Sequence, residues 1–562
     1  MPYRNMLLKR WTREDGTPSG SSSRAESRTP MAEDDSDYEE DGESDLQRIQ
    51  ELLSRKLELL QTENENPLNK VHTAGDAKQH AALAVNKSII ESQSTTINDI
   101  IASLGLPRTE VSTLSRELLL AQLYKLVVSK PLVVYNEEHQ GSAHFVDEEK
   151  MQRLVNHFTG GNYRSDVEFL YLFRSLATLI VSNIDDFGEF LSSDFMEQIE
   201  KLITEPTTSV ITNDNKANLI SGYVTLLLVL HHGSSSFGID DKINWLIDIA
   251  EGFSMSALTL RKNVETGDRE HSTFFDANVD KNLISEAWGK VAAEVSVAVA
   301  ALHGIACLLT LLERGDYLNE LSEDLMLKLV VLVDNDEIRE IAKAAGRVIA
   351  VIYESYLYDE DDEDADDEEY NANAPYYEQE ALFSIFTRLT NLSSKKVSKK
   401  DKKEFNSVFR NILHTLEAYV DSEKRSSIYR KTPEGVELIN SIMDSTYIKL
   451  SKFKSLSINS WFLYARLRHL RWAFSFGLHN QLVANESIRD ILKEPETEFK
   501  SYDQYDFDAS KLENEQAYAE YASELLDHKH ISDDKARSRK IKKERVNKMT
   551  AQFEDIELAD TK

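Results

Sequence analysis

The chain has 562 residues, a formal net charge of −32 and 41% apolar residues. This length is too great for a single hydrophobic core and predicts several domains or one long repeat array. Only 20 glycines and 10 prolines occur, too few for the frequent tight turns of an all-β fold. The composition therefore favours a helical protein over a β-sandwich.

The first region, residues 1–80, is predicted to be disordered except for one short helix. It is polar and rich in serine, and it contains the acidic tract Asp34–Asp45. Leucine and isoleucine residues recur at helical spacing between Leu46 and Leu60, which predicts the helix there. The N-terminus lacks the apolar run and cleavage site of a secretory signal.

Residues 82–357 repeat one theme, in which an apolar segment of helical period is followed by a short polar break. Such a series predicts an α-solenoid of the HEAT or armadillo kind. In the helix that begins near Asp166, the apolar residues fall on one stripe, as a core-facing helix requires. The predicted helices span 84–104, 112–129, 147–158, 166–182, 190–203, 216–231, 239–259, 283–313, 320–333 and 336–356.

The segment Val295–Leu312 carries no formal charge over eighteen residues, which is long enough for a membrane span. Its flanks show no positive-inside asymmetry, so the prediction favours a helix buried within the helical stack. The segment contains Cys307, the only cysteine. One cysteine excludes an intrachain disulfide and a Cys-based zinc site, and it fits a reducing compartment.

An acidic tract at residues 359–369 lies in a predicted disordered insert, 358–377. A C-terminal helical domain is predicted for residues 378–530, and residues 531–562 form a basic C-terminal helix and tail. The helices predicted in this domain are 378–392, 402–419, 434–449, 457–476, 480–493 and 514–527.

The segment Lys535–Lys548 is strongly basic, with eight basic residues against one acid, Glu544. On a helix these charges point in all directions and leave no apolar face that could dock on a protein core. Enclosure by phosphate groups would order such a helix, so it predicts an RNA-binding arm, with a solvated tail or a nuclear localisation signal as alternatives. The candidate residues are Lys535, Arg537, Arg539, Lys540, Lys542, Lys543, Arg545 and Lys548.

Two other basic clusters are candidate secondary RNA contacts. A lysine cluster precedes the helix at 402–419, where a soluble loop and cap is an equal alternative. Arginines alternate with aromatic residues in 457–476, which resembles a stacking platform for bases, although Leu463, Leu467 and Leu470 are spaced as core and favour packing. The candidate residues are Lys399, Lys400, Lys402, Lys403, Arg466, Arg468 and Arg471.

Four blocks resemble the interferon-related developmental regulator family. They are SKKDKKEFNSVFRNILHTLE at Ser398–Glu417, a block at Leu456–Leu492 in which Ser460 and Trp461 begin a helix, DKARSRKIKKERVNKM at Asp534–Met549, and DNDEIREIAKAAGRVIAVIYE at Asp334–Glu354. The resemblance covers most of residues 150–550, and the long N-terminus and the acidic insert depart from it.

The resemblance implies a helical-repeat protein that is not an enzyme and needs no cofactor. In this family, proteins are described both as transcriptional co-regulators and as factors on translationally inactive ribosomes. In the ribosomal role the body occupies tRNA sites while the C-terminal helix enters the mRNA channel. The implied partner is small-subunit rRNA, and binding of a tRNA or an elongation factor alongside is left open.

No catalytic motif occurs in the sequence: there is no phosphate-binding loop, dinucleotide fingerprint, HExxH or GxSxG, and the histidines do not cluster at metal-ligand spacing. We therefore expect no enzyme activity, metal, membrane partner or small-molecule substrate. The prediction is a cytoplasmic ribosome-binding factor that silences translation. The alternative is a nuclear adaptor whose solenoid binds co-regulator proteins.

Overall fold

The computed structural model describes residues 36–65, 96–131, 145–271, 279–335, 337–358, 374–391, 399–432, 435–438, 443, 446–450 and 455–493. Predictions that concern residues 1–35, the acidic tract at 359–369, the helix at 514–527 and the basic tail fall outside these residues. Nearly all regular structure in the described part is helical, which confirms the predicted all-α solenoid class.

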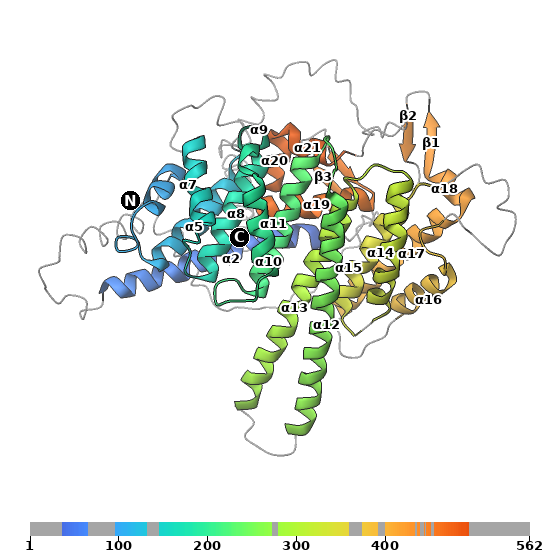
Figure 1. Cartoon of the computed structure of the whole chain (residues 1–562), viewed down its shortest axis with the longest axis horizontal. Coiled ribbons are helices and arrows are strands. Elements are labelled where there is room, and N and C mark those ends of the chain that lie inside the picture. The colour runs from blue at the N-terminus through green and yellow to red at the C-terminus, as the bar shows by residue number, and fades with distance from the viewer. Residues whose placement is uncertain are drawn as a thin grey trace, which may run out of the picture. The chain divides into compact units, whose positions relative to one another are not determined.

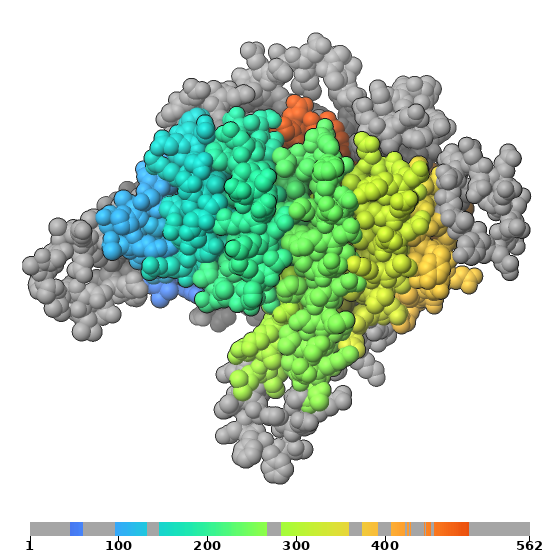
Figure 2. Space-filling view, in the orientation of Figure 1, coloured from blue at the N-terminus to red at the C-terminus, as the bar shows by residue number. Residues whose placement is uncertain are grey.

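Residues 97–355 form two layers of helices (Figure 1). Figure 2 shows on one face that they follow one another in chain order, from blue to yellow. In the inner layer each helix contacts the next, and the outer helices pack on this row. The inner helices are α5 (Thr113–Ser129), α8 (Asp166–Ser182), α11 (Asn213–His231), α13 (Val279–Leu309) and α15 (Arg339–Ser355). The others are α4 (Ile97–Leu104), α7 (Glu148–Thr159), α9 (Ile184–Phe187), η2 (Gly188–Phe190), α10 (Ser193–Thr204), α12 (Ile239–His271) and α14 (Asp316–Asp334).

Short polar side chains set the starts of several of these helices. Ser112, Ser165, Ser192 and Thr212 each precede a helix with extended backbone, and each side chain accepts a hydrogen bond from the backbone N–H three residues later. Such a cap satisfies one of the N–H groups that have no partner within the helix, and it stabilises the helix by about 1 kcal/mol. The helix starts were therefore predictable from sequence to within a few residues.

Helix α8 is buried on more sides than its sequence stripe indicated. Arg174, Ser175 and Thr178 lie off that stripe and are nonetheless buried. The reason is that α5, α7, α11 and a helix from the C-terminal part of the chain surround α8. A single core-facing stripe describes a helix with one covered face, and this helix has several.

Helix α13 contains the uncharged segment, and by length and hydropathy its stretch Leu283–Leu309 could cross a membrane. In the structure 67% of the most apolar window is buried against the protein's own helices. Its partners are α11, α12 and α15, and Cys307 lies fully buried among them. The burial agrees with the predicted core helix.

The helix predicted at 434–449 is wrong. Strands β1 (Tyr429–Thr432) and β2 (Gly435–Leu438) pair antiparallel, and so do β3 (Thr446–Lys449) and β4 (Ser455–Ile458). β-branched and aromatic residues such as Thr446, Tyr447 and Ile448 favour strands over helices, and here they pair with residues 455–458. The next helix accordingly begins at Trp461 and not at 457.

The remaining helices lie before residue 97 or after residue 355. They are α2 (Ser36–Glu65), α16 (Gln379–Thr390), α17 (Lys399–Val420), α18 (Ser422–Ile428), α19 (Trp461–Phe474), η3 (Ser475–Gly477), α20 (Leu478–Ala484) and α21 (Glu486–Ile491). Helix α2 begins inside the acidic tract that we predicted as disordered. Its Asp45 accepts a hydrogen bond of 2.6 Å from Ser475 and lies 3.4 Å from the guanidinium of Arg174, which gives this acid defined partners.

Helix α19 crosses the inner layer of the solenoid and contacts α5, α8, α11, α13 and α15 (Figure 1). Its N-terminus is capped twice. The hydroxyl of Ser460 accepts from the backbone N–H of Leu463 at 3.2 Å, and the buried carboxylate of Glu354 accepts from that of Phe462 at 3.0 Å. The second cap comes from α15, so it fixes α19 to the solenoid. The boundary at residue 378 between two helical domains stays a prediction.

Candidate nucleic-acid interface

The principal predicted RNA-binding residues, from Lys535 to Lys548, lie outside the described residues. The lysine cluster lies partly within them, because Lys399, Lys400, Lys402 and Lys403 belong to the first turns of α17. Only the backbone of these lysines is described. Both sets therefore stay predictions. The candidate site whose side chains the structure describes is the arginine-bearing helix α19.

Arg466 of α19 is buried, with 4% of its surface exposed. Its guanidinium donates to the hydroxyl of Thr310 at 2.9 Å, to the backbone carbonyl of Thr310 at 2.7 Å and to that of Ile491 at 3.0 Å, and it stacks 4.2 Å above the ring of Phe462. These contacts join α19 to the ends of α13 and α21. The prediction that Arg466 faces RNA is therefore wrong, because its donors are used to hold the core together.

The aromatic residues of α19 are also part of the core. Trp461, Phe462 and Tyr464 are at most 9% exposed, and the indole N–H of Trp461 donates to Thr415 at 2.7 Å. Leu463, Leu467 and Leu470 are buried as predicted. Packing therefore prevails over the alternative of a platform on which bases stack, since buried ring faces cannot meet a base.

His469 is fully buried on the same helix. Its Nδ1 lies 3.3 Å from the carbonyl oxygen of Ser221, and its Nε2 lies 3.2 Å from that of His303. A neutral imidazole can donate to only one of these two oxygens. Burial nevertheless lowers the pKa of His469 to about 4, against the smaller opposing effect of the two carbonyls.

This pKa predicts a loss of stability in acid. Between pH 6.5 and about 4, the unfolded chain binds a proton at His469 that the folded chain does not, so the free energy of unfolding falls as the pH falls. The loss for this residue approaches ~3 kcal/mol. Urea unfolding of the wild type and of His469→Gln across pH 4–7.5 measures this loss. Below pH 6.5 the free energy of unfolding should fall more steeply with falling pH in the wild type, and above pH 6.5 the two curves should run parallel. Parallel curves over the whole range would contradict the assignment.

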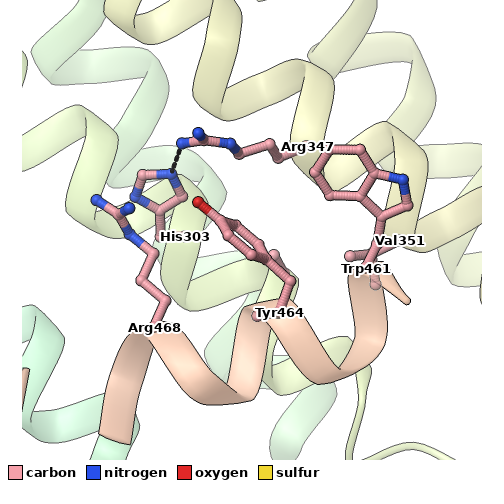
Figure 3. Close-up of a pocket in the computed structure, with 8 residues that line it drawn as sticks. His303, Arg347, Val351, Trp461, Tyr464 and Arg468 are labelled. Atoms are coloured by element: carbon pink, nitrogen blue, oxygen red, sulfur yellow. Dashed lines mark hydrogen bonds between the residues drawn. The ribbon is translucent and has the colours of Figure 1, made fainter. Parts of the chain in front are cut away.

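Arg468 and Arg471 lie on the outward side of α19. Arg468 is exposed and Arg471 is half-buried. Arg468 also lines a small pocket between α13, α15 and α19, which Figure 3 shows. The pocket is lined by His303, Ala306, Arg347, Val351, Trp461, Tyr464, Ala465 and Arg468.

Arg347 and Arg468 are the two charged residues of this lining. Burial lowers the pKa of His303 well below its ordinary value, and the neighbouring Arg468 and Arg347 lower it further. Burial acts to raise the pKa of Tyr464, but Arg347, Arg468 and Arg471 together outweigh it and the pKa is lowered. Both shifts have the sign that an excess of cations produces.

Sequence reasoning found Arg468 and missed its partners. His303 lies in an apolar helix and Arg347 in a helix with a regular apolar stripe. Nothing in their spacing relates them to residues 464–468, more than a hundred positions later. Only the crossing of α19 over α13 and α15 brings them together.

The chain matches the sequence model of the interferon-related developmental regulator family over residues 256–417. The match runs from the middle of α12 through α15, with Arg347, and ends at Glu417 in α17. Among curated proteins, none matches the chain significantly. The blocks at Leu456–Leu492 and Asp534–Met549 lie beyond the matched residues, so their resemblance stays a prediction. Residues 256–417 of the chain are therefore similar to the interferon-related developmental regulator family.

Proposed function

We propose that this protein is a non-enzymatic ribosome-binding factor that silences translation. In this proposal the helical body occupies tRNA sites, and the basic segment Lys535–Lys548 lies in the mRNA channel of a cytoplasmic ribosome. The factor would exclude mRNA sterically. It would not cut or modify RNA.

The observation that carries the proposal is the charge of this segment, eight basic residues against Glu544, in a chain of net charge −32. Basic side chains bind RNA by neutralising phosphates and releasing counterions. The acidic remainder of the chain opposes adhesion to RNA elsewhere, so stable binding requires a site that matches its shape. The lysine cluster at 399–403 and Arg471 are proposed as secondary contacts of the same kind.

Truncation after Ser532 tests the proposal, because it removes the basic segment and leaves the described helices intact. Association with ribosomes in a sedimentation gradient should fall at least tenfold. The slope of the logarithm of the binding constant against the logarithm of the salt concentration should become shallower by roughly 0.7 for each lost phosphate contact. Truncation after Met549 is the matched control, since it also shortens the tail but keeps all eight basic residues.

The outcome against the proposal is equal, salt-resistant association of both truncated chains with ribosomes. Exclusively nuclear localisation together with partners that resist RNase would instead favour the adaptor alternative. In that case the basic segment would serve as an import signal.

A further inference from the structure

Helices α12 and α14 contact each other and run in the same direction (Figure 1). The hydroxyl of Tyr317, at the start of α14, donates to Asp240 at 2.5 Å. Further along α14, the ammonium of Lys328 lies 3.0 Å from Asp248, which is further along α12. Both contacts advance together, so the helices are parallel. The surface formed by residues 240–255 of α12 and 317–331 of α14 is called the α12–α14 seam below.

One end of the seam carries exposed apolar side chains. Met255 is 72% exposed, Leu327 53% and Val331 68%. Met255 lies one turn beyond Glu251, and Val331 lies one turn beyond Lys328. Because Glu251 and Lys328 form an ion pair of 3.7 Å, the apolar residues one turn further on are neighbours across the two helices. An exposed apolar cluster of this kind is typical of an interaction surface.

The rest of the seam is acidic, with seven acids and two lysines. The acids are Asp240, Asp241, Asp248, Glu251, Glu320, Glu323 and Asp324. The hydrogen bond to Asp240 raises the pKa of the Tyr317 hydroxyl, and the charges of Asp241 and Glu320 act in the same direction. The seam therefore repels nucleic acid and anionic membranes, and it attracts a segment that is both basic and apolar.

The C-terminal segment of the chain has such a pattern. On a helix, positions 535, 539, 542, 546, 549, 553 and 556 form one stripe, because they are spaced alternately by four and three residues. The first three positions are basic and the last four are apolar: Lys535, Arg539, Lys542, Val546, Met549, Phe553 and Ile556. The basic half of the stripe has charge on its other sides as well, and the apolar half follows it along the chain.

The segment and the seam agree in length and order. Arg539 and Phe553 are as far apart in sequence as Tyr317 and Val331, which corresponds to about 21 Å along a helix. A helix parallel to α14 would place its basic half at the acidic end of the seam and its apolar half against Met255. Residues 494–534 connect the segment to the end of α21, and about 40 residues can span more than ~100 Å.

We propose that the segment Lys535–Ile556 docks as a helix on the α12–α14 seam of its own chain when no RNA is bound. Tethering gives the segment a local concentration of about 1 mM, so a dissociation constant of about 0.1 mM keeps roughly nine-tenths of the molecules docked. The basic side chains in contact with the seam are then withheld from phosphates. This competition with RNA rests on the proposed function, and the docking itself does not.

Photo-crosslinking of the full-length chain tests the docking. With p-benzoylphenylalanine in place of Phe553, mass spectrometry should find crosslinks at the apolar end of the seam, around Met255, Leu327 and Val331. The crosslinked product should be a monomer, and its yield should not depend on protein concentration. Raising the salt from ~0.1 to ~0.5 M should lower the yield, because screening weakens the attraction between the basic half and the acids.

Two double substitutions make the test specific. Met255→Ser with Val331→Ser removes apolar contacts, and Asp241→Lys with Asp324→Lys reverses charge. Each should lower the crosslink yield at Leu327 at least about fivefold. The control for charge is Asp185→Lys with Glu189→Lys, which makes the same change at exposed positions away from the seam and should leave the yield unaltered. All the substituted side chains are exposed, and circular dichroism checks that the fold is retained.

Binding of a uridylate 20-mer gives the second readout. Met255→Ser with Val331→Ser should bind it up to about tenfold more tightly than the wild type, because the docked form no longer withholds the segment. Seam crosslinks in a chain that binds neither RNA nor ribosomes would support the docking and refute the proposed function.

Three results would overturn the docking. The first is crosslinks that lie outside α12 and α14. The second is a yield at Leu327 that is equal in the wild type and in both seam variants. The third is a product that consists mainly of crosslinked dimers, which would assign the seam to a second copy of the chain.

Discussion

Gly477→Ala is expected to destabilise the protein by roughly 3 kcal/mol or more, at or above the usual cost of overfilling a packed core position. An added Cβ at Gly477 would overlap the backbone carbonyl of Val128, with the carbonyl carbon at 2.7 Å. A backbone group in α5 cannot turn aside as a flexible side chain can. The chain would therefore have to separate α5 from the segment that follows α19.

Urea unfolding followed by circular dichroism measures this effect, with Gly252→Ala as the matched control. Gly252 lies within α12, and an added Cβ there meets no atom within 4 Å. Because alanine is the better helix former, Gly252→Ala should stabilise by about 0.5–1 kcal/mol. Equal stability of Gly477→Ala and the wild type would show that α5 and η3 do not approach as closely as the structure has them.

Arg466→Met is expected to cost roughly 3–5 kcal/mol. Methionine retains much of the apolar stem but removes the donors to the carbonyls of Thr310 and Ile491 and to the Thr310 hydroxyl. These acceptors would remain buried without the guanidinium, and each unsatisfied group costs about 1–3 kcal/mol. The ends of α13 and α21 would lose their common connection to α19.

The control for Arg466→Met is Arg153→Met, at an arginine that is 54% exposed and pairs with Glu149 on the surface of α7. Its substitution should change the free energy of unfolding by less than about 0.5 kcal/mol. If Arg466→Met were as stable as this control while losing ribosome association, Arg466 would be an RNA contact after all. Loss of stability in Arg466→Met alone agrees with the core position.

Much of the solenoid was predictable because helix formation there depends on residues that are close together in the sequence. Apolar periodicity located α5, α8 and α14, and hydroxyl caps such as Ser112 and Thr212 fixed helix starts. The same local signals failed at residues 434–449, where two short hairpins replace the predicted helix. A hairpin forms when two strands pair, and the apolar periodicity of a single segment does not reveal its partner strand.

For the candidate site, the sequence by itself determined the charge of the segment Lys535–Lys548, because charge is a property of residue type. It also marked the arginines of α19 without saying which of them are accessible. Only the tertiary structure decided that Arg466 is a core residue and Arg468 an exposed one, since both lie on one helix and the difference is made by α13 and α21 on one side and solvent on the other. The pocket likewise exists only after folding, because its lining residues come from three helices that are far apart in the sequence.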